Sequence, residues 1–311
     1  MRRPSAGNVT DRESDGEGSR LAWQALVEQQ ARLRQAARRL HAARAADVHD
    51  ARVAARRLRS LLSTWRPLFD QRRSQPLRRR IREFARALSG ARDADVRRDL
   101  LLSAAGRVPS VAADDLRVLR TVLRRDRAES RRSLRAVLAS ADWAESVDVL
   151  CDQQTLVALR LRPDAGLAEL LELVDQPWRD ANRLLASRLG GVAKLHRLRL
   201  ALKRCRYALE PVSSLQPGRA ARTIDRLRSL QDSLGEHRDA VAARQWLETH
   251  QALLGCSLTQ RLDQELRLIE KQRKADVLRR ATGLMPAYAK WRTALRGLRA
   301  PLEASRDPGS P

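Results

Sequence analysis

Two stretches of the sequence carry histidine and arginine at the same spacing. The first, VHDARVAARRLRS, covers residues 48–60, and the second, LHRLRLALKRCRY, covers residues 195–207. At ~100° per residue in a helix, four basic residues of each stretch fall on one face roughly 80° wide. We call these faces the first basic stripe, made of His49, Arg52, Arg56 and Arg59, and the second basic stripe, made of His196, Arg199, Lys203 and Arg206.

The chemistry of both stripes is that of an anion site. Arginine offers a planar fork of donors that matches a phosphate group. Neither stripe contains an acid, so both lack the i,i+4 partners of an ordinary solvated helix face, which is the alternative interpretation. Neighbouring arginines should depress the pKa of His49 and His196 by like-charge repulsion, and a bound phosphate should reverse this. The alternative for His49 and for His196 is a structural role, in which the side chain packs against its neighbours or caps a helix and binds no anion. Arg57 and Arg204 flank the stripes as second-tier candidates.

Each stripe needs a helix that buries its other side. The residues away from the stripes are small or apolar: Ala51, Ala54, Ala55, Leu58, Leu61 and Leu62 in the first stretch, and Leu198, Ala201, Leu202, Cys205, Ala208 and Leu209 in the second. The pattern returns after nearly half the chain, which indicates an internal repeat. We therefore expect two related helical bundles, each burying the apolar face of its own stretch.

Apolar periodicity predicts helices along the rest of the chain. One helix is expected from Leu21 to about Ala45, with Asp47 as the cap of the next. A long helix is expected over about 112–139, and breaks are expected at Pro163, at Pro177 and at Gly190-Gly191. The long helix carries a further arginine stripe, either a solvated face or a second wall of the anion site: Arg117, Arg120, Arg124, Arg127, Arg131 and Arg135.

The bulk composition agrees with a polyanion partner. The 311 residues carry a net charge of +25 and a pI near 11.5, with 43% hydrophobic residues and 3% aromatics. Such a field indicates nucleic acid, polyphosphate or an anionic membrane surface. Three scattered cysteines indicate a reducing compartment, so we expect a cytoplasmic protein. No apolar run is long enough for a membrane span. No nucleotide-binding or nucleophile motif occurs, and the histidines lie among arginines, so we expect no enzyme activity, no cofactor and no metal.

A second motif follows each basic stretch. Arg92-Asp93 lies in LSGARDADV and Arg238-Asp239 in LQDSLGEHRDA. Together with the two stretches, these motifs resemble the CHAD family, the conserved histidine α-helical domain, over about residues 21–299. One departure is that Gly235 lies three residues before Arg238, whereas Ser89 takes that place in the first half. The resemblance implies an all-helical domain of two related bundles that binds inorganic polyphosphate. We take Arg92 and Arg238 as second-tier binding residues, held by their neighbouring aspartates.

These observations predict an all-α protein of two pseudo-symmetric helical bundles that form one CHAD-like domain. A basic groove is expected between or along the helices that carry the stripes. The expected division is a disordered tail over 1–19, a domain over 20–303 with halves 20–160 and 161–303, and a flexible tail over 304–311. The expected function is non-catalytic binding of polyphosphate. Two alternatives are sequence-independent binding of nucleic acid, which would also compete as a polyanion, and a scaffold that recruits protein partners to polyphosphate granules.

Overall fold

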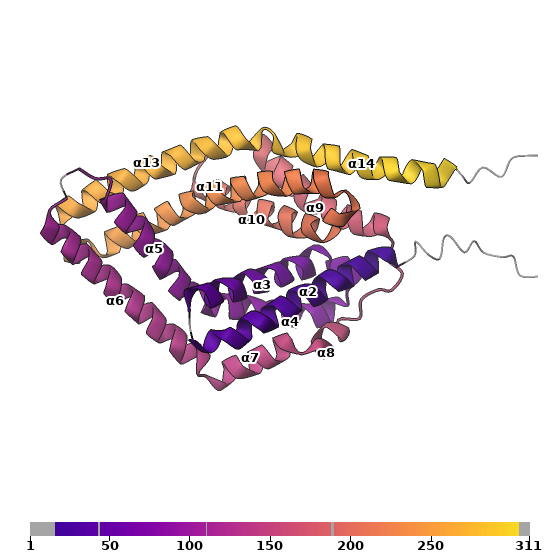
Figure 1. Cartoon of the computed structure of the whole chain (residues 1–311), viewed down its shortest axis with the longest axis horizontal. Helices are drawn as coiled ribbons and strands as arrows, with labels where there is room; N and C mark the ends of the chain where they lie inside the picture. The colour runs from indigo at the N-terminus through magenta and orange to yellow at the C-terminus, as the bar shows by residue number, and fades with distance from the viewer. Residues whose placement is uncertain (1–15, 43, 110, 188–189, 305–311) are drawn as a thin grey trace, which may run out of the picture. The chain divides into compact units, whose positions relative to one another are not determined.

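The structure is a computed structural model that describes residues 16–42, 44–109, 111–187 and 190–304 (Figure 1). Within these ranges the chain forms α-helices and short 3-10 helices and no strand, which confirms the all-α prediction. Residues 1–15 and 305–311, which make up most of the two predicted tails, lie outside the described residues. Helix α2 begins at Glu17, inside the segment predicted as the N-terminal tail.

The described chain divides into two compact units. Of the described residues, the first unit comprises those up to Gln176 and Ala243–Glu265, and the second comprises Pro177–Ala242 and those from Leu266 onward. Helices α9, α11 and α13 therefore contribute residues to both units. The predicted halves of the repeat divide the sequence at another point and stay a prediction.

The first unit consists mainly of the helices from α2 to α8. Its elements are α2 (Glu17–Arg39), η1 (Leu40–Ala42), α3 (Ala45–Thr64), η2 (Arg66–Leu68), α4 (Gln71–Ala87), α5 (Ser89–Ala105), α6 (Ala113–Leu138), α7 (Ala141–Cys151), α8 (Gln153–Val157), the start of α9 (Leu167–Ala186), the end of α11 (Pro217–Thr249), α12 (Gln251–Leu254) and the start of α13 (Cys256–Ala281). Helix α3 packs against α2 and α4, and α5 packs against α6. Leu26, Leu33, Leu58 and Leu62 are almost completely buried at this core.

The second unit is held together by contacts between distant segments. It contains the end of α9, α10 (Val192–Leu209), η3 (Glu210–Leu215), most of α11, the end of α13, and α14 (Leu284–Ala304). The ring of Trp178 stacks on that of Tyr288, with centroids 3.8 Å apart. Gln231 Nε2 on α11 donates to the carbonyl oxygen of Leu202 on α10 at 2.9 Å. The first contact joins α9 to α14, and the second joins α10 to α11.

The N-terminus of α3 differs from its prediction. Arg44, not Asp47, occupies the N-cap position, and Asp47 lies in the first turn. Asp47 Oδ1 accepts a hydrogen bond from Arg39 Nε on α2 at 2.9 Å, so the carboxylate joins two helices instead of capping one. A carboxylate in the first turn still interacts favourably with the helix dipole.

The segment before α10 contains one predicted break and lacks another. Pro177 lies inside α9 and does not end it, because the buried side chains of Val174, Trp178 and Ala181 hold the helix on both sides of the proline. The break before α10 is confirmed, since the helix begins at Val192. Gly191 has a φ of 75°, a conformation that glycine adopts without strain.

The Arg-Asp motifs lie in different helical contexts. In the first unit, α4 ends at Ala87 and α5 begins at Ser89, so a junction at Leu88 precedes Arg92. The corresponding part of the second unit is one continuous helix, because α11 spans 33 residues from Pro217 and runs through Gly235. The displaced glycine noted in the sequence therefore accompanies a helix without a break.

Candidate anion-binding site

Helix α3 presents the first basic stripe to solvent. The six small or apolar residues predicted for its other side are all buried, with at most 4% of each residue exposed. Taken as whole residues, His49 is exposed, and Arg52, Arg56 and Arg59 are partly exposed. The division into a buried apolar face and a basic face was thus predicted correctly for this helix.

Neighbouring helices add cations to this stripe. Arg78 and Arg82 on α4 lie close enough to Arg59 to lower its pKa, together with burial, which is the largest cause, and with Arg56. Sequence reasoning missed Arg78 and Arg82. Helix α4 contains many arginines, and which of them approach α3 depends on how the two helices pack.

Most of these cations lack a counter-ion. Among the described residues, Arg56, Arg59 and Arg82 have no hydrogen bond or ion pair, and the buried Nε of Arg56 has no acceptor. Arg78 donates to the hydroxyl of Ser63, at 3.3 Å. Like charges held together without an acid raise the free energy of the site, and an anion placed among them would lower it.

Arg52 is fixed more firmly than the rest of the stripe. Its Nη1 donates to the hydroxyl oxygen of Ser89 at the start of α5. Ser89 in turn donates to the carbonyl oxygen of Ala85 at 2.9 Å. The side chain is therefore oriented by the junction between α4 and α5.

Helix α10 presents the second basic stripe in the same way. The six residues predicted for its buried side are all 0% exposed. Taken as whole residues, His196 is exposed, while Arg199, Lys203 and Arg206 are partly exposed. Arg206 is already engaged: its Nε lies 3.8 Å from Glu210 Oε1, and its guanidinium lies 5.1 Å from the ring centroid of Tyr207.

Each unit surrounds its histidine with the same set of cations. Partial burial of the His49 ring lowers its pKa most, followed by the charges of Arg92 and Arg56, with a smaller contribution from Arg52; Asp50 raises it. The expected direction is therefore confirmed, but the expected main cause, like-charge repulsion, is wrong, because burial contributes more.

The second unit repeats the arrangement. Partial burial again lowers the pKa of His196 most, followed by the charges of Arg199, Arg238 and Lys203. The arginine of each Arg-Asp motif thus lies near the histidine of its own unit. This gives Arg92 and Arg238 a more direct place in the site than the sequence suggested. Arg238 Nη1 also lies 3.6 Å from Asp239 Oδ1, in a half-exposed ion pair of the kind expected there.

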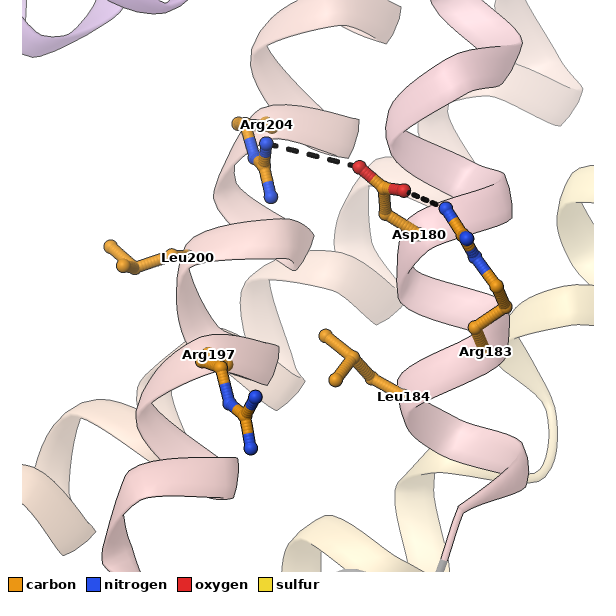
Figure 2. A pocket seen from close by; sticks show the side chains of 6 residues that line it. All are labelled: Asp180, Arg183, Leu184, Arg197, Leu200 and Arg204. Atoms are coloured by element: carbon orange, nitrogen blue, oxygen red, sulfur yellow. Dashed lines mark hydrogen bonds and ion pairs between the residues drawn. The ribbon is translucent and has the colours of Figure 1, made fainter.

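The two second-tier arginines beside the stripes, Arg57 and Arg204, lie in different surroundings. Arg57 is partly exposed beside the first stripe. Arg204 instead faces α9, where its Nη1 lies 3.9 Å from Asp180 Oδ2, and it lines a separate cleft (Figure 2). The structure therefore places Arg204 away from the second basic stripe.

The arginine stripe of α6 is partly neutralised. Arg127 Nε lies 2.5 Å and Arg131 Nη2 3.7 Å from Oδ1 of the buried Asp95 on α5. Arg117 Nη1 lies 2.6 Å from Asp114 Oδ1 on its own helix. These pairs favour a structural role for much of this face.

The described residues also bear on membrane insertion and metal binding. Within the described ranges, no helix is long and apolar enough to cross a membrane. In the same ranges, no three His, Cys, Asp or Glu residues converge as potential metal ligands. The shared groove between the two stripes involves both units and stays a prediction.

Comparisons with known proteins place this geometry in a family context. The family model of the CHAD domain matches residues 22–248. PptA from Streptomyces chartreusis has a similar structure, with a TM-score of 0.65 and 21% identity, covering 88% of this chain and 99% of that chain. The CHAD domain from the plant Ricinus communis is also similar, with a TM-score of 0.69 and 24% identity, covering 88% of this chain and 93% of that chain. No curated protein matches the chain. At these identities the two solved structures show a common fold.

Proposed function

The chain belongs to the CHAD domain family, and we propose that it binds inorganic polyphosphate through the two basic stripes. The family is linked to polyphosphate binding. The proposal is for binding without catalysis, since the stripes supply positive charge and hydrogen-bond donors to phosphate oxygens, and binding needs nothing further. We further propose that the protein is cytoplasmic and associates with polyphosphate granules.

The observation that supports the proposal most is the arrangement around each histidine. Each unit places one imidazole, two basic residues of the same helix and the arginine of an Arg-Asp motif close enough to interact. Around the first stripe, Arg56, Arg59 and Arg82 have no ion pair among the described residues. A chain of phosphates offers many negative charges at close spacing and would compensate several of these cations at once.

The placement of the aromatic residues favours polyphosphate over single-stranded nucleic acid. Proteins that bind single strands stack bases on exposed aromatic side chains. Here Trp65, Trp178 and Trp291 are at most 1% exposed. Trp246 is 8% exposed and stacks on His250, with ring centroids 4.1 Å apart. These four rings serve the cores of their units and offer no platform for a base. Trp23 and Trp143 are half-buried, and the ring of Trp143 stacks on that of Phe84, with centroids 4.5 Å apart. Polyphosphate has no bases and needs no aromatic platform.

A competition experiment separates polyphosphate from nucleic acid as the ligand. A fluorescently labelled polyphosphate bound to the protein is displaced by unlabelled polyphosphate or by duplex DNA, compared at equal phosphate concentration and fixed salt. We expect polyphosphate to displace the probe at a concentration about tenfold lower or less, because a narrow flexible chain can follow a stripe of side chains. Displacement by DNA at an equal or lower concentration would instead support the nucleic-acid alternative.

A further inference from the structure

A cleft between α9 and α10 in the second unit lies apart from the second basic stripe. Its volume is about 380 Å³, and it is lined by Asp180, Arg183 and Leu184 of α9 and by Arg197, Leu200 and Arg204 of α10. Figure 2 shows Asp180 and Leu184 of α9 extending toward α10 and Arg204 of α10 paired with Asp180, whereas Leu200 extends in this view from the side of α10 away from α9. This volume is within the range of small-molecule sites.

The charges of the cleft are unevenly compensated. Asp180 accepts a hydrogen bond from Arg183 of its own helix and also pairs with Arg204, so one carboxylate serves two arginines at one end (Figure 2). At the other end, Arg197 has no hydrogen bond or ion pair among the residues that the structure describes. An anionic group that enters the cleft is therefore expected to pair with Arg197.

The part of the cleft between these ends is apolar. Leu200 lies one turn from both Arg197 and Arg204, and it is 43% exposed, whereas Leu195, Leu198 and Leu202 of α10 are at most 3% exposed. Leu184 extends from α9 toward the same space (Figure 2). A single exposed leucine is ordinary. Two leucines that line one cleft beside an arginine without a partner among the described residues are a more specific arrangement.

The repeat does not reproduce this arrangement in the first unit. The positions that align with Arg197 and Leu200 are Asp50 and Val53. Asp50 Oδ2 lies 3.2 Å from Arg39 Nη2, so an ion pair between α2 and α3 occupies the equivalent place. The cleft is therefore specific to the second unit. It is not part of the pattern of histidine and basic residues that the two stripes share.

We propose that this cleft binds a small amphipathic anion, in which one phosphate or carboxylate group is attached to a short apolar body. The acidic group pairs with the Arg197 guanidinium, and the apolar body contacts Leu184 and Leu200. A bare chain of phosphates fits this cleft poorly, because it would leave the leucines without an apolar partner and would approach Asp180. The inference does not depend on the polyphosphate proposal.

Hexyl phosphate is a suitable probe, titrated by calorimetry below its micelle concentration against the full chain. Methyl phosphate has the same acidic group without the apolar body, and 1-hexanol has the apolar body without the charge. Three variants are compared with the wild type: Arg197→Gln, Leu200→Gln, and Arg222→Gln as a matched control. Arg222 is exposed on α11 of the same unit and has no partner among the described residues, so its replacement removes the same charge elsewhere.

We expect one hexyl phosphate to bind per chain, at least about tenfold more tightly than methyl phosphate, because each buried methylene strengthens binding roughly fourfold. Arg197→Gln and Leu200→Gln should each weaken this binding about tenfold, while Arg222→Gln should leave it unchanged. Binding of 1-hexanol should not respond to Arg197→Gln. Polyphosphate affinity should persist in both cleft variants, which separates this site from the stripes.

Three results would overturn the proposal. The first is equal affinity for hexyl and methyl phosphate, which would show that the leucines contribute nothing. The second is an unchanged affinity in Arg197→Gln or Leu200→Gln. The third is an equal loss in Arg197→Gln and Arg222→Gln, which would reduce the effect to the general positive field. Matching thermal unfolding curves for all variants exclude misfolding as a cause, since both cleft positions are on exposed helix faces.

Discussion

Histidine and arginine contribute differently to the two stripes. An arginine stays charged at any physiological pH, so Arg56 and Arg59 attract an anion constantly. The charge of His49 and His196 depends on their surroundings, because partial burial and nearby cations lower the pKa of both rings. A histidine among arginines therefore makes anion binding sensitive to pH.

The pH dependence of binding follows from the sign of these shifts. In the free protein, partial burial and nearby cations hold the pKa of both histidines below its ordinary value, which favours the neutral imidazole. A bound polyphosphate raises the pKa, and the complex takes up protons. Affinity for polyphosphate should therefore increase as the pH falls from the histidine pKa in the complex to the histidine pKa in the free protein. Below the pKa of the free protein, the affinity should stay constant.

The measurement compares wild type with His49→Gln/His196→Gln. From about pH 7.5 to about pH 5.5, we expect wild-type affinity for polyphosphate to increase about tenfold more than that of the double variant. Protonation of polyphosphate itself affects both proteins equally, so its contribution cancels when the two pH profiles are compared. Parallel pH profiles would show that the imidazoles do not respond to the ligand.

At the scale of the elements, α5 and α6 are joined by buried charge. Asp95 is 7% exposed and interacts with Arg127 and Arg131. Arg97 Nη2 donates to Asp126 Oδ2 at 2.6 Å, and the Arg97 guanidinium lies 5.4 Å from the ring centroid of Trp246. Arginines of the α6 face therefore help to hold the helix in place.

Replacing Asp95 tests this structural role. Asp95→Ala should lower the free energy of unfolding by about 1–3 kcal/mol, because Arg127 and Arg131 lose their carboxylate in a partly buried place. Asp114→Ala is the control, since Asp114 pairs with Arg117 where both side chains are over three-quarters exposed. Its effect should stay within about 0.5 kcal/mol. Urea unfolding of both variants gives the comparison, and equal effects would contradict a structural role for the Asp95 pairs.

The continuous helix α11 makes a second prediction about an element. Gly235 lies inside this helix, and an added Cβ would meet no atom within 4 Å. Gly235→Ala should therefore stabilise the protein by about 0.5–1 kcal/mol. Gly191→Ala should destabilise it, because Gly191 has a φ of 75°. Thermal unfolding measures both, and a loss of stability in Gly235→Ala would mean that this part of α11 needs the flexibility of glycine.

The sequence predicted elements well where one helix determines its own faces. The buried and basic sides of α3 and α10 follow from helical periodicity alone. It failed where a second element intervenes: Asp47 pairs with Arg39 of α2, and Pro177 stays inside α9 because buried neighbours hold the helix. Arg78 and Arg82 were missed for the same reason, since their approach to Arg59 depends on packing between α3 and α4.

At the scale of the whole molecule, the fold class and the family were predictable but the compact units were not. Helical periodicity and the four motifs identify an all-α CHAD domain, and the family model confirms it. The first unit, however, includes Ala243–Glu265, which the sequence order assigns to the second half. Such long-range contacts, including those of Trp246 with Asp126 and Arg97, leave no local pattern in the sequence. The basic groove expected between or along α3 and α10 stays a prediction.

Polyphosphate affinity in two variants of equal charge tests the central claim most directly. One variant, R56Q/R59Q/R199Q/K203Q, removes four cations from the stripes. The other, R117Q/R120Q/R124Q/R135Q, removes four cations from the face of α6. It keeps Arg127 and Arg131, which pair with Asp95. Their affinities for polyphosphate of one length are measured at one salt concentration, after thermal unfolding shows that both are folded. We predict a loss of about 100-fold or more for the first variant, because each charge-assisted contact contributes ~1.5–3 kcal/mol, and a much smaller loss for the second. Equal losses would contradict the account and show that polyphosphate responds only to the positive field of the whole surface.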